Sequence, residues 1–358
     1  MNLTLHLTKT CNLACAYCYQ KHEQETMSIQ TARAAADMVF SYPHKAHGFS
    51  LYGGEPLLAR EVIEDLVTYA AQKTERTGRT VRYKMTTNGT LLDEEFLCFA
   101  GKHQIAIALS HDGAAQDISR RFPNGRGTAK TLEPKIDMLL KHQPNAVALA
   151  TVTPHTLPDM ADSVLWLYKR GFIRVNTALD ARPDAGWAED DLATLGAQYR
   201  AIGDYLIARA QNGQLLDYLN FTAKIRAHVT GKGCITCELG LTQPSADTDG
   251  KLYPCNQFVG QTAFQMGDVW QGVDMEKLKD FCTRKVSPSI CESCALAGRC
   301  RHACACLNFQ QTGRLDRVSP AQCEMERIVI AEADRVGKAL YELMGDAFLD
   351  RFGQVTAG

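Results

Sequence analysis

The first 180 residues alternate between short apolar runs and amphipathic stretches, and this alternation is the strongest constraint on the fold. The apolar runs are predicted to be strands and lie at 3–8, 48–53, 81–87, 104–110, 145–153 and 172–178. The amphipathic stretches are predicted to be helices and lie at 28–42, 59–74, 93–102, 127–142 and 157–171, with a further helical region at 188–231. Strands that alternate with helices predict parallel pairing. Their apolar centres favour a sheet buried on both faces.

Six strand–helix units are too few to close an eight-stranded barrel. We therefore predict an α/β fold whose core is a partial (β/α)6 TIM-like barrel, followed by a cysteine-rich domain. The predicted segments are the barrel at 1–185, a helical bridge at 186–230, the cysteine-rich domain at 231–325 and a C-terminal helix at 326–358. Functional groups are expected at the C-terminal ends of the strands.

The cysteines are numerous and unevenly placed. Of the fourteen, three lie at 11–18, one is Cys98 and ten lie between Cys234 and Cys323. The N-terminus lacks a signal-peptide pattern, and no run of eighteen apolar residues occurs, so we expect a cytoplasmic protein with no membrane span. In that reducing compartment, grouped cysteines are more often metal ligands than disulfides. The formal net charge of −1 indicates no basic face for nucleic acid.

The first group has the spacing C-x3-C-x2-C and directly follows the first predicted strand. Its members are Cys11, Cys15 and Cys18. Three thiolates can hold three irons of a [4Fe–4S] cluster and leave the fourth iron open, as catalytic metal sites do. The spacing alone also allows a zinc site that is completed by a distant histidine or cysteine.

Four short motifs lie at successive predicted strand ends. They are the cysteine motif with Tyr17 before its last cysteine, "YGGEP" at 52–56, "TTNGT" at 86–90 and "LSHDG" at 109–113. In this order they resemble the radical S-adenosylmethionine (SAM) superfamily. The resemblance implies a partial barrel and a cluster whose open iron is chelated by SAM.

The resemblance also implies which residues contact SAM. Gly53 and Gly54 would expose backbone groups close to the ligand, since glycine has no side chain. Glu55 would accept a hydrogen bond from the SAM ammonium. The remaining implied contacts are Tyr17, Asn88, Ser110 and either Arg120 or Arg121, which would reach the SAM carboxylate. A turn-capping serine and solvated arginines are the alternatives for the last three.

The C-terminal cysteines match the spacing of the SPASM domain, an auxiliary-cluster module of radical SAM enzymes. By that resemblance one [4Fe–4S] cluster takes Cys234, Cys237, Cys255 and Cys304, and another takes Cys291, Cys294, Cys300 and Cys323. Three clusters are thus expected in all. Zinc ribbons are the alternative, because paired cysteines also bind zinc. Cys282 and Cys306 are spare, and Cys98 is predicted to be a small buried apolar residue.

The resemblance is closest to maturases of cysteine-rich, ribosomally made peptides, which form thioether crosslinks. In anaerobic sulfatase-maturating enzymes an aspartate base follows "YPC", whereas this chain has Asn256. Formylglycine formation is therefore the alternative, and a non-enzymatic iron–sulfur electron carrier is another. Expected partners are a cysteine-containing peptide and an electron donor such as flavodoxin or ferredoxin. Because the sequence begins at the first strand, leader recognition is expected to need a separate leader-binding protein or a surface in the bridge or the C-terminal helix. No catalytic acid or base is assigned, although His111, His302 and Tyr19 lie near the motifs.

Overall fold

The computed structural model describes residues 1–233, 238–284 and 289–353. The chain forms two compact units, each built from segments that are far apart in the sequence. The first unit comprises Met1–Ser110, Arg120–Ala146 and Glu238–Arg284, and the second comprises His111–Ser119, Val147–Cys237 and Lys285–Gly358.

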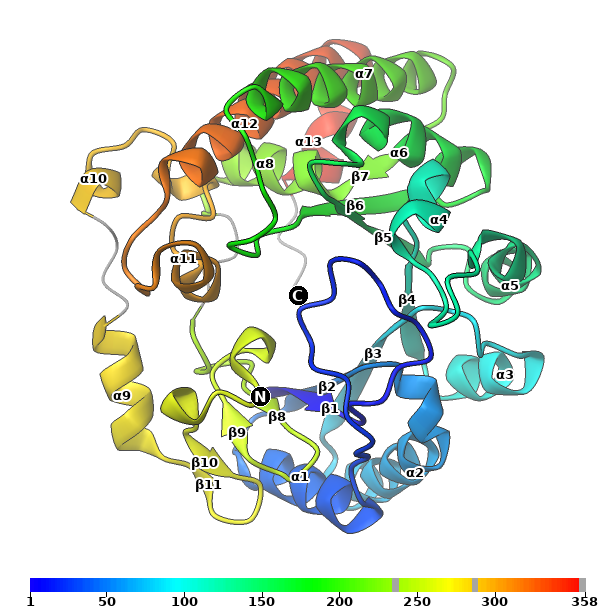
Figure 1. Ribbon diagram of the computed structural model, residues 1–358, viewed down its shortest axis with the longest axis vertical. Coiled ribbons are helices and arrows are strands. Elements are labelled where there is room, and N and C mark those ends of the chain that lie inside the picture. Colours follow the sequence, from blue (N-terminus) through cyan, green and yellow to red (C-terminus); the bar gives the residue numbers. More distant parts are fainter. Residues whose placement is uncertain (234–237, 285–288, 354–358) are drawn as a thin grey trace. The chain divides into compact units, whose positions relative to one another are not determined.

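The first unit contains a mostly parallel sheet (Figure 1). Its strands are β1 (Asn2–His6), β2 (Ala46–Tyr52), β3 (Thr80–Thr87), β4 (Ile105–Ser110), β8 (Ser245–Ala246) and β9 (Leu252–Tyr253), in the order β4-β3-β2-β1-β8-β9. Residues Leu5, Leu51 and Met85 pair across β1, β2 and β3. Only β9 runs antiparallel, against β8. A separate small hairpin joins β10 (Gly267–Asp268) and β11 (Gly272–Val273).

Helices of the first unit follow its strands as predicted. They are α1 (Ile29–Ser41), α2 (Arg60–Thr77), α3 (Glu94–Lys102), α5 (Ala129–His142) and, near the end of the unit, α9 (Met275–Arg284). Ser28 is the N-cap of α1, because its side chain accepts a hydrogen bond from the Thr31 N–H. A 3-10 turn, η1 (Pro56–Ala59), connects β2 to α2.

The prediction that the sheet is buried on both faces is confirmed in β1, where four consecutive residues are buried, but it is wrong for other strands. Along β4, the side chains of Ile105, Ile107 and Leu109 are buried, whereas those of Ala106, Ala108 and Ser110 are exposed or half-buried. The same alternation occurs in β3 and in β5 (Val147–Val152) of the second unit. Because successive side chains point to opposite faces, one face packs while the other stays accessible.

The second unit combines three parallel strands with helices. Its strands are β5 (Val147–Val152), β6 (Arg174–Leu179) and β7 (Asp217–Tyr218). Its helices are α4 (Gln116–Ser119), α6 (Met160–Lys169), α7 (Asp191–Gln211), α8 (Leu219–Thr230), α10 (Ser289–Glu292), α11 (Ala305–Thr312), α12 (Pro320–Met344) and α13 (Asp346–Phe352). Helix α12 packs against α7 and α8.

All six predicted strands are present, and the differences lie in the later part of the chain. The region 188–231 is not wholly helical, because β7 separates α7 from α8. The C-terminal helix ends at Met344, where Gly345 has a positive φ of 56°, and α13 follows. The described residues include no helix with the length and apolar character needed to cross a lipid bilayer.

A buried asparagine completes the hydrogen bonding of β6. Asn220 accepts from the Thr177 N–H at 2.9 Å and donates to the Thr177 carbonyl at 2.8 Å, so that its amide acts as a short strand partner. Both groups of Thr177 lie in a buried segment, where an unpaired backbone group is costly.

We predict that Asn220→Leu lowers the free energy of unfolding by about 2–4 kcal/mol, because two buried backbone groups lose their partner. Anaerobic chemical denaturation measures the change. Asn212→Leu is the matched control, because Asn212 is exposed and donates only to the Ala208 carbonyl of its own helix. Equal stability of the two variants would contradict the assigned role.

Candidate active site

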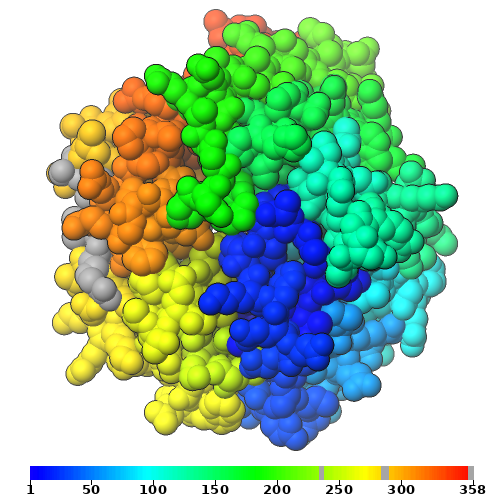
Figure 2. All heavy atoms as spheres, viewed as in Figure 1, coloured from blue at the N-terminus to red at the C-terminus, as the bar shows by residue number. Residues whose placement is uncertain are grey.

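The segment between β1 and α1 carries Cys11, Cys15 and Cys18. All three side chains are half-buried. The segment lies at the C-terminal end of β1. Figure 2 shows the N-terminal part of the chain, in blue, at the surface that faces the viewer. A tight turn in which the Cys18 N–H donates to the Cys15 carbonyl at 3.0 Å shapes the motif. The three predicted ligands therefore lie at the strand end where the alternation predicted function.

Two glycines allow the cysteine segment to approach the end of β2. Gly54 donates its N–H to the Thr8 carbonyl at 2.7 Å, and Glu55 donates its N–H to the Thr10 carbonyl at 3.0 Å. A Cβ on Gly54 would lie 2.2 Å from the Thr10 carbonyl oxygen, and Gly53 has a φ of 134°. These glycines are thus required for backbone contact with the cysteine segment, a role that the sequence did not reveal.

Ion pairs and a hydrogen bond connect the cysteine segment between β1 and α1 to the turn between β8 and β9. Lys9 forms ion pairs with Glu25 at 2.9 Å and with the buried carboxylate of Asp247 at 3.2 Å. Thr248 donates a hydrogen bond to Glu25. Because one carboxylate is buried and the lysine bridges two partners, this cluster restrains the segment more than an isolated surface pair would.

The thiols themselves favour a cation. The pKa of the Cys11 thiol is raised to about 11, mainly by burial and in smaller part by the nearby Glu55 carboxylate and the Cys15 and Cys18 thiols. Three thiols and a carboxylate that lie this close together ionise readily only when a nearby positive charge compensates their negative charges. The donor set and its surroundings therefore fit iron held by three thiolates.

Glu55 is completely buried and joins two strand ends. Its carboxylate accepts hydrogen bonds from the Leu57 N–H at 3.1 Å, the Thr87 hydroxyl at 2.7 Å and the Asn88 N–H at 2.8 Å. Burial is the largest influence on its pKa, which is raised despite the three donors. A carboxylate has about four acceptor positions, so roughly one is left for a ligand.

Asn88 links β3 to the cysteine segment. Its Nδ2 donates to Asn12 Oδ1 at 2.8 Å and lies 3.9 Å from Cys11 Sγ. Asn12 in turn donates to the Thr90 hydroxyl at 2.8 Å. The sequence identified Asn88 but missed Asn12 and Thr90, which show no spacing signal of their own.

The other predicted SAM contacts occupy distinct positions. The Arg120 guanidinium is buried and lies over the Tyr17 ring at 5.2 Å, whereas Arg121 is exposed and accepts the Ala14 N–H at its carbonyl. Burial beside the cysteine motif therefore favours Arg120 over its neighbour. Ser110 is half-buried at the last position of β4. The contacts of these residues with SAM stay predictions.

A polar chain connects the first cysteine motif with a later cysteine. Tyr19, which follows Cys18, has its hydroxyl 3.1 Å from that of Tyr52, and Asn256 Nδ2 lies 3.4 Å from the Tyr19 hydroxyl. Asn256 Oδ1 is 3.1 Å from Cys255 Sγ. The residue after "YPC" thus contacts both a predicted auxiliary ligand and the segment of the first cluster.

Two histidines near the site were missed by the sequence reasoning. His22 Nε2 lies 3.4 Å from Cys18 Sγ. His6 is buried at the end of β1 with its ring edge-on to Tyr52, and burial, together with the Lys9 charge, lowers its pKa to about 4. A polar residue within the apolar pattern of the first strand was the available signal for His6.

A second cysteine site lies within the second unit. Cys291, Cys294, Cys300 and Cys323 line one pocket of about 360 Å³ that is open to solvent. Its walls also include apolar residues such as Val318 and Ile330. The four residues that the SPASM resemblance assigns to one auxiliary cluster are therefore brought together, with Cys323 supplied by the first turn of α12.

Charge beneath this pocket is arranged around a buried lysine. Burial raises the pKa of Cys300 to about 12, with the Glu326 carboxylate as a further cause. Lys224 compensates that carboxylate through an ion pair of 2.5 Å and also donates to the Arg299 carbonyl at 2.7 Å. The pocket disfavours uncompensated thiolates, which fits a metal-binding role.

The remaining cysteines have different surroundings. Cys306 is buried in α11, with its sulfur 3.5 Å from that of Cys304. Cys282 is half-buried in α9. Cys234 and Cys237 lie outside the described residues. The prediction that Cys98 is buried is wrong, because its side chain is exposed on α3.

The histidine of "LSHDG" has a structural position in the second unit. The His111 ring stacks on Trp166 at 4.9 Å, and its Nδ1 accepts the Gly113 N–H at 3.0 Å. Asp112 accepts the Thr151 N–H at 2.9 Å. His302 instead lines the four-cysteine pocket. These contacts give neither histidine a catalytic assignment.

Comparison with known families gives the class of the protein. The family model described as the radical SAM superfamily matches residues 5–167. This range includes the cysteine motif, the glycines and Glu55, and the ends of β3 and β4. Residues 5–167 therefore form a radical SAM domain, and the chain is an enzyme; a radical SAM domain implies a [4Fe–4S] cluster and SAM.

Individual relatives agree with this class. Mycofactocin maturase MftC of Mycolicibacterium smegmatis is 24% identical over 93% of this chain and 85% of its own. The cysteine-type anaerobic sulfatase-maturating enzyme of Clostridium perfringens (strain ATCC 13124) is 22% identical over 75% of this chain and 76% of its own. An uncharacterised protein of Methanocaldococcus jannaschii is 30% identical over 48% of this chain, which spans 59% of that relative's length.

Solved structures share the fold. The structure of anSMEcpe with bound AdoMet superposes with a TM-score of 0.79 at 18% identity, covering 99% of this chain and 96% of that one. Streptococcus suis SuiB bound to precursor peptide SuiA superposes with a TM-score of 0.62 at 16% identity, covering 90% and 75%. The predicted fold class, an α/β partial barrel, is confirmed.

We predict that Gly54→Ala reduces bound iron by about one cluster, because the new Cβ would collide with the Thr10 carbonyl and displace Cys11. Iron analysis after anaerobic reconstitution measures the loss. Gly101→Ala is the control, since a Cβ there meets nothing within 4 Å. Unchanged iron in the Gly54 variant would contradict the close-approach argument.

The buried His6 predicts a pH dependence of stability. The pKa of His6 in the folded chain is about 4, below its ordinary value of 6.5, so the unfolded chain binds the extra proton as pH falls through this window. The free energy of unfolding should fall by about 2 kcal/mol between pH 7 and pH 5 from this residue. His6→Leu should reduce that slope in urea titrations at each pH. The exposed His44→Leu should leave the slope unchanged.

Proposed function

We propose that this radical SAM enzyme is a maturase that modifies a peptide or protein substrate. The observation that carries the proposal is the convergence of three cysteines, Glu55 and Asn88 at the ends of β1, β2 and β3. Relatives named as maturases of mycofactocin and of sulfatases support it. So does the fold shared with SuiB, which has been solved with the precursor peptide SuiA.

Residues of this chain would divide the work at the first site. When bound to Cys11, Cys15 and Cys18, the cluster together with SAM supplies a 5′-deoxyadenosyl radical that removes a hydrogen atom from the substrate. Asn88 directs an N–H toward Cys11 sulfur, which orients that ligand. The remaining acceptor position of Glu55 suits the SAM ammonium.

Two further residues would complete the SAM site. Arg120, held beside Tyr17, suits the SAM carboxylate, because a guanidinium pairs well with carboxylates. Ser110 at the end of β4 faces SAM or the substrate. These roles follow the family resemblance, and the burial of Arg120 supports its choice over Arg121.

The later cysteines would hold two auxiliary [4Fe–4S] clusters. The pocket lined by Cys291, Cys294, Cys300 and Cys323 supports one of them. The other would use Cys234, Cys237, Cys255 and Cys304, of which the first two lie outside the described residues. Cys306, 3.5 Å from Cys304, would be a replacement ligand or a thiol partner for substrate.

The reaction we favour is formation of a crosslink, and a thioether is the crosslink we expect. The side chain after Cys255 is an amide that contacts Cys255 sulfur and the Tyr19 hydroxyl. An amide does not accept a proton as a carboxylate base does, which disfavours formylglycine formation. That oxidation is the second candidate, because sulfatase-maturating enzymes are among the relatives.

The substrate would be a cysteine-containing peptide. A flavodoxin or ferredoxin would supply electrons, and a separate leader-binding protein would present the peptide.

Two assays test the proposal in order. The reduced, reconstituted enzyme is incubated with SAM, and formation of 5′-deoxyadenosine is measured. Mass spectrometry of candidate peptides then separates the reactions, because a crosslink removes two hydrogen atoms while joining two side chains. Cysteine or serine converted to an aldehyde would instead identify formylglycine formation. If the clusters are intact but no deoxyadenosine forms, the proposed SAM cleavage is refuted, and with it both candidate peptide reactions.

We predict that Cys15→Ala abolishes deoxyadenosine formation and lowers iron by about one cluster, because it removes one of three ligands.

Cys294→Ala should keep deoxyadenosine formation but lose peptide product or auxiliary iron. Cys282→Ala is the control for a cysteine outside all three predicted ligand sets. A normal product yield from the Cys294 variant would exclude that cluster from the reaction.

A further inference from the structure

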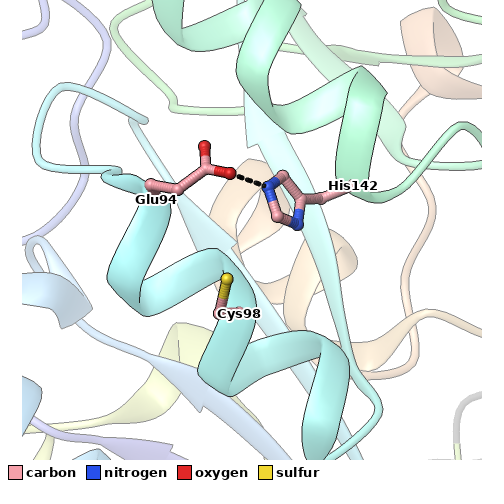
Figure 3. Close-up of side chains that lie close together, drawn as sticks. All are labelled: Glu94, Cys98 and His142. Atoms are coloured by element: carbon pink, nitrogen blue, oxygen red, sulfur yellow. Dashed lines mark hydrogen bonds and ion pairs between the residues drawn. The ribbon is translucent and has the colours of Figure 1, made fainter.

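Three metal-binding side chains lie together on the first unit, away from the cysteine motif in sequence. Glu94 and Cys98 are four residues apart on α3, and His142 is the last residue of α5 (Figure 3). One ligand atom from each lies within 4.8 Å of the others. Glu94 Oε1 is 2.8 Å from His142 Nε2.

The two helices hold these side chains on a rigid support. Residues separated by four positions share one helix face, which places Glu94 and Cys98 side by side. The neighbouring Phe96 and Leu97 are fully buried and anchor α3. Lys135 of α5 donates to the Leu92 carbonyl at 2.5 Å, immediately before α3.

The position of His142 is fixed by the residue that follows it. Gln143 accepts the Ile107 N–H at 3.0 Å and donates to the Ile105 carbonyl at 2.9 Å, so that it binds the end of α5 to β4. A site whose ligands come from anchored helices is held more exactly than one built on loops. The exposed Glu94 and Cys98 side chains need only rotate to close on an ion.

We propose that Glu94, Cys98 and His142 form a zinc site with its fourth position open to water. A carboxylate oxygen, an imidazole nitrogen and a thiolate sulfur are all common zinc ligands, whereas calcium and magnesium prefer oxygen alone. Two anionic ligands and one neutral imidazole balance the charge of Zn²⁺. The Cys98 thiol loses its proton to solvent on binding, and the ring nitrogen of His142 that binds zinc carries no hydrogen.

This site is separate from the proposed peptide modification. Its ligands belong to none of the three predicted cluster sets, and the ion would join α3 to α5 across their packed surface. Binding to the folded chain alone stabilises it by mass action. The site therefore predicts zinc-dependent stability of this part of the first unit, whatever the substrate is.

The test uses the anaerobically reconstituted enzyme with its clusters in place. After equilibrium dialysis against Zn²⁺, zinc and iron are counted together, and one zinc per chain is expected without loss of iron. Cys98→Ala and His142→Ala should each weaken zinc binding at least tenfold. His103→Ala is the matched control, because that half-buried histidine at the end of α3 lies outside the ligand group.

X-ray absorption spectroscopy at the zinc edge then identifies the atoms that bind zinc and their distances from it, without interference from iron. The proposal requires one sulfur at about 2.3 Å with the remaining nitrogen or oxygen ligands at about 2.0–2.1 Å. Three or four sulfurs would mean that zinc has entered a cluster site and would overturn the assignment. Absence of bound zinc, or binding that is equal in all variants with iron retained, would overturn it as well.

Discussion

The close approach of the cysteine segment to the end of β2 is the constraint on which the first site depends. The N–H groups of Gly54 and Glu55 bond to the carbonyls of Thr8 and Thr10, and a Cβ on Gly54 would nearly overlap one of those oxygens. Backbone contact at this distance leaves the segment little room to shift. The position of Cys11 is therefore set by the backbone of β2 before any iron binds.

The buried carboxylate of Glu55 carries this constraint to the next strand. Removing a carboxylate from water is costly unless donors compensate it, and here Leu57, Thr87 and Asn88 do so. The same carboxylate raises the pKa of the Cys11 thiol. Negative groups are thus gathered where metal would neutralise them, so iron binding and stability of this region are expected to be coupled.

The second cysteine site follows similar physical chemistry with different supports. Its thiols line a pocket whose walls are largely apolar, and Glu326 below Cys300 is paired with the buried Lys224. Helices α8 and α12 supply this ion pair, so the pocket is built on anchored elements. The exposed group at Glu94, Cys98 and His142 lacks such burial, which suits an exchangeable ion better than a permanent cluster.

Local patterns explain why so much was predictable. Strand and helix periodicity depends on neighbours in sequence, and all six barrel strands appear where the pattern indicated. The two-residue strands β7, β8 and β9 are too short to show a period. Cys98 was misplaced because adjacent helical residues differ by about 100° in direction, so a buried Leu97 says little about its neighbour.

The sequence by itself therefore determined the α/β class, the order of the motifs and the kinds of ligand that the chain offers, because these depend on composition and short spacings. Only the tertiary structure decided that Gly54 makes room for Thr10, that Arg120 and not Arg121 is buried beside Tyr17, and that Asn256 joins Cys255 to Tyr19. Those relations join segments up to 237 positions apart, and contact over such separations is fixed by packing and not by local pattern.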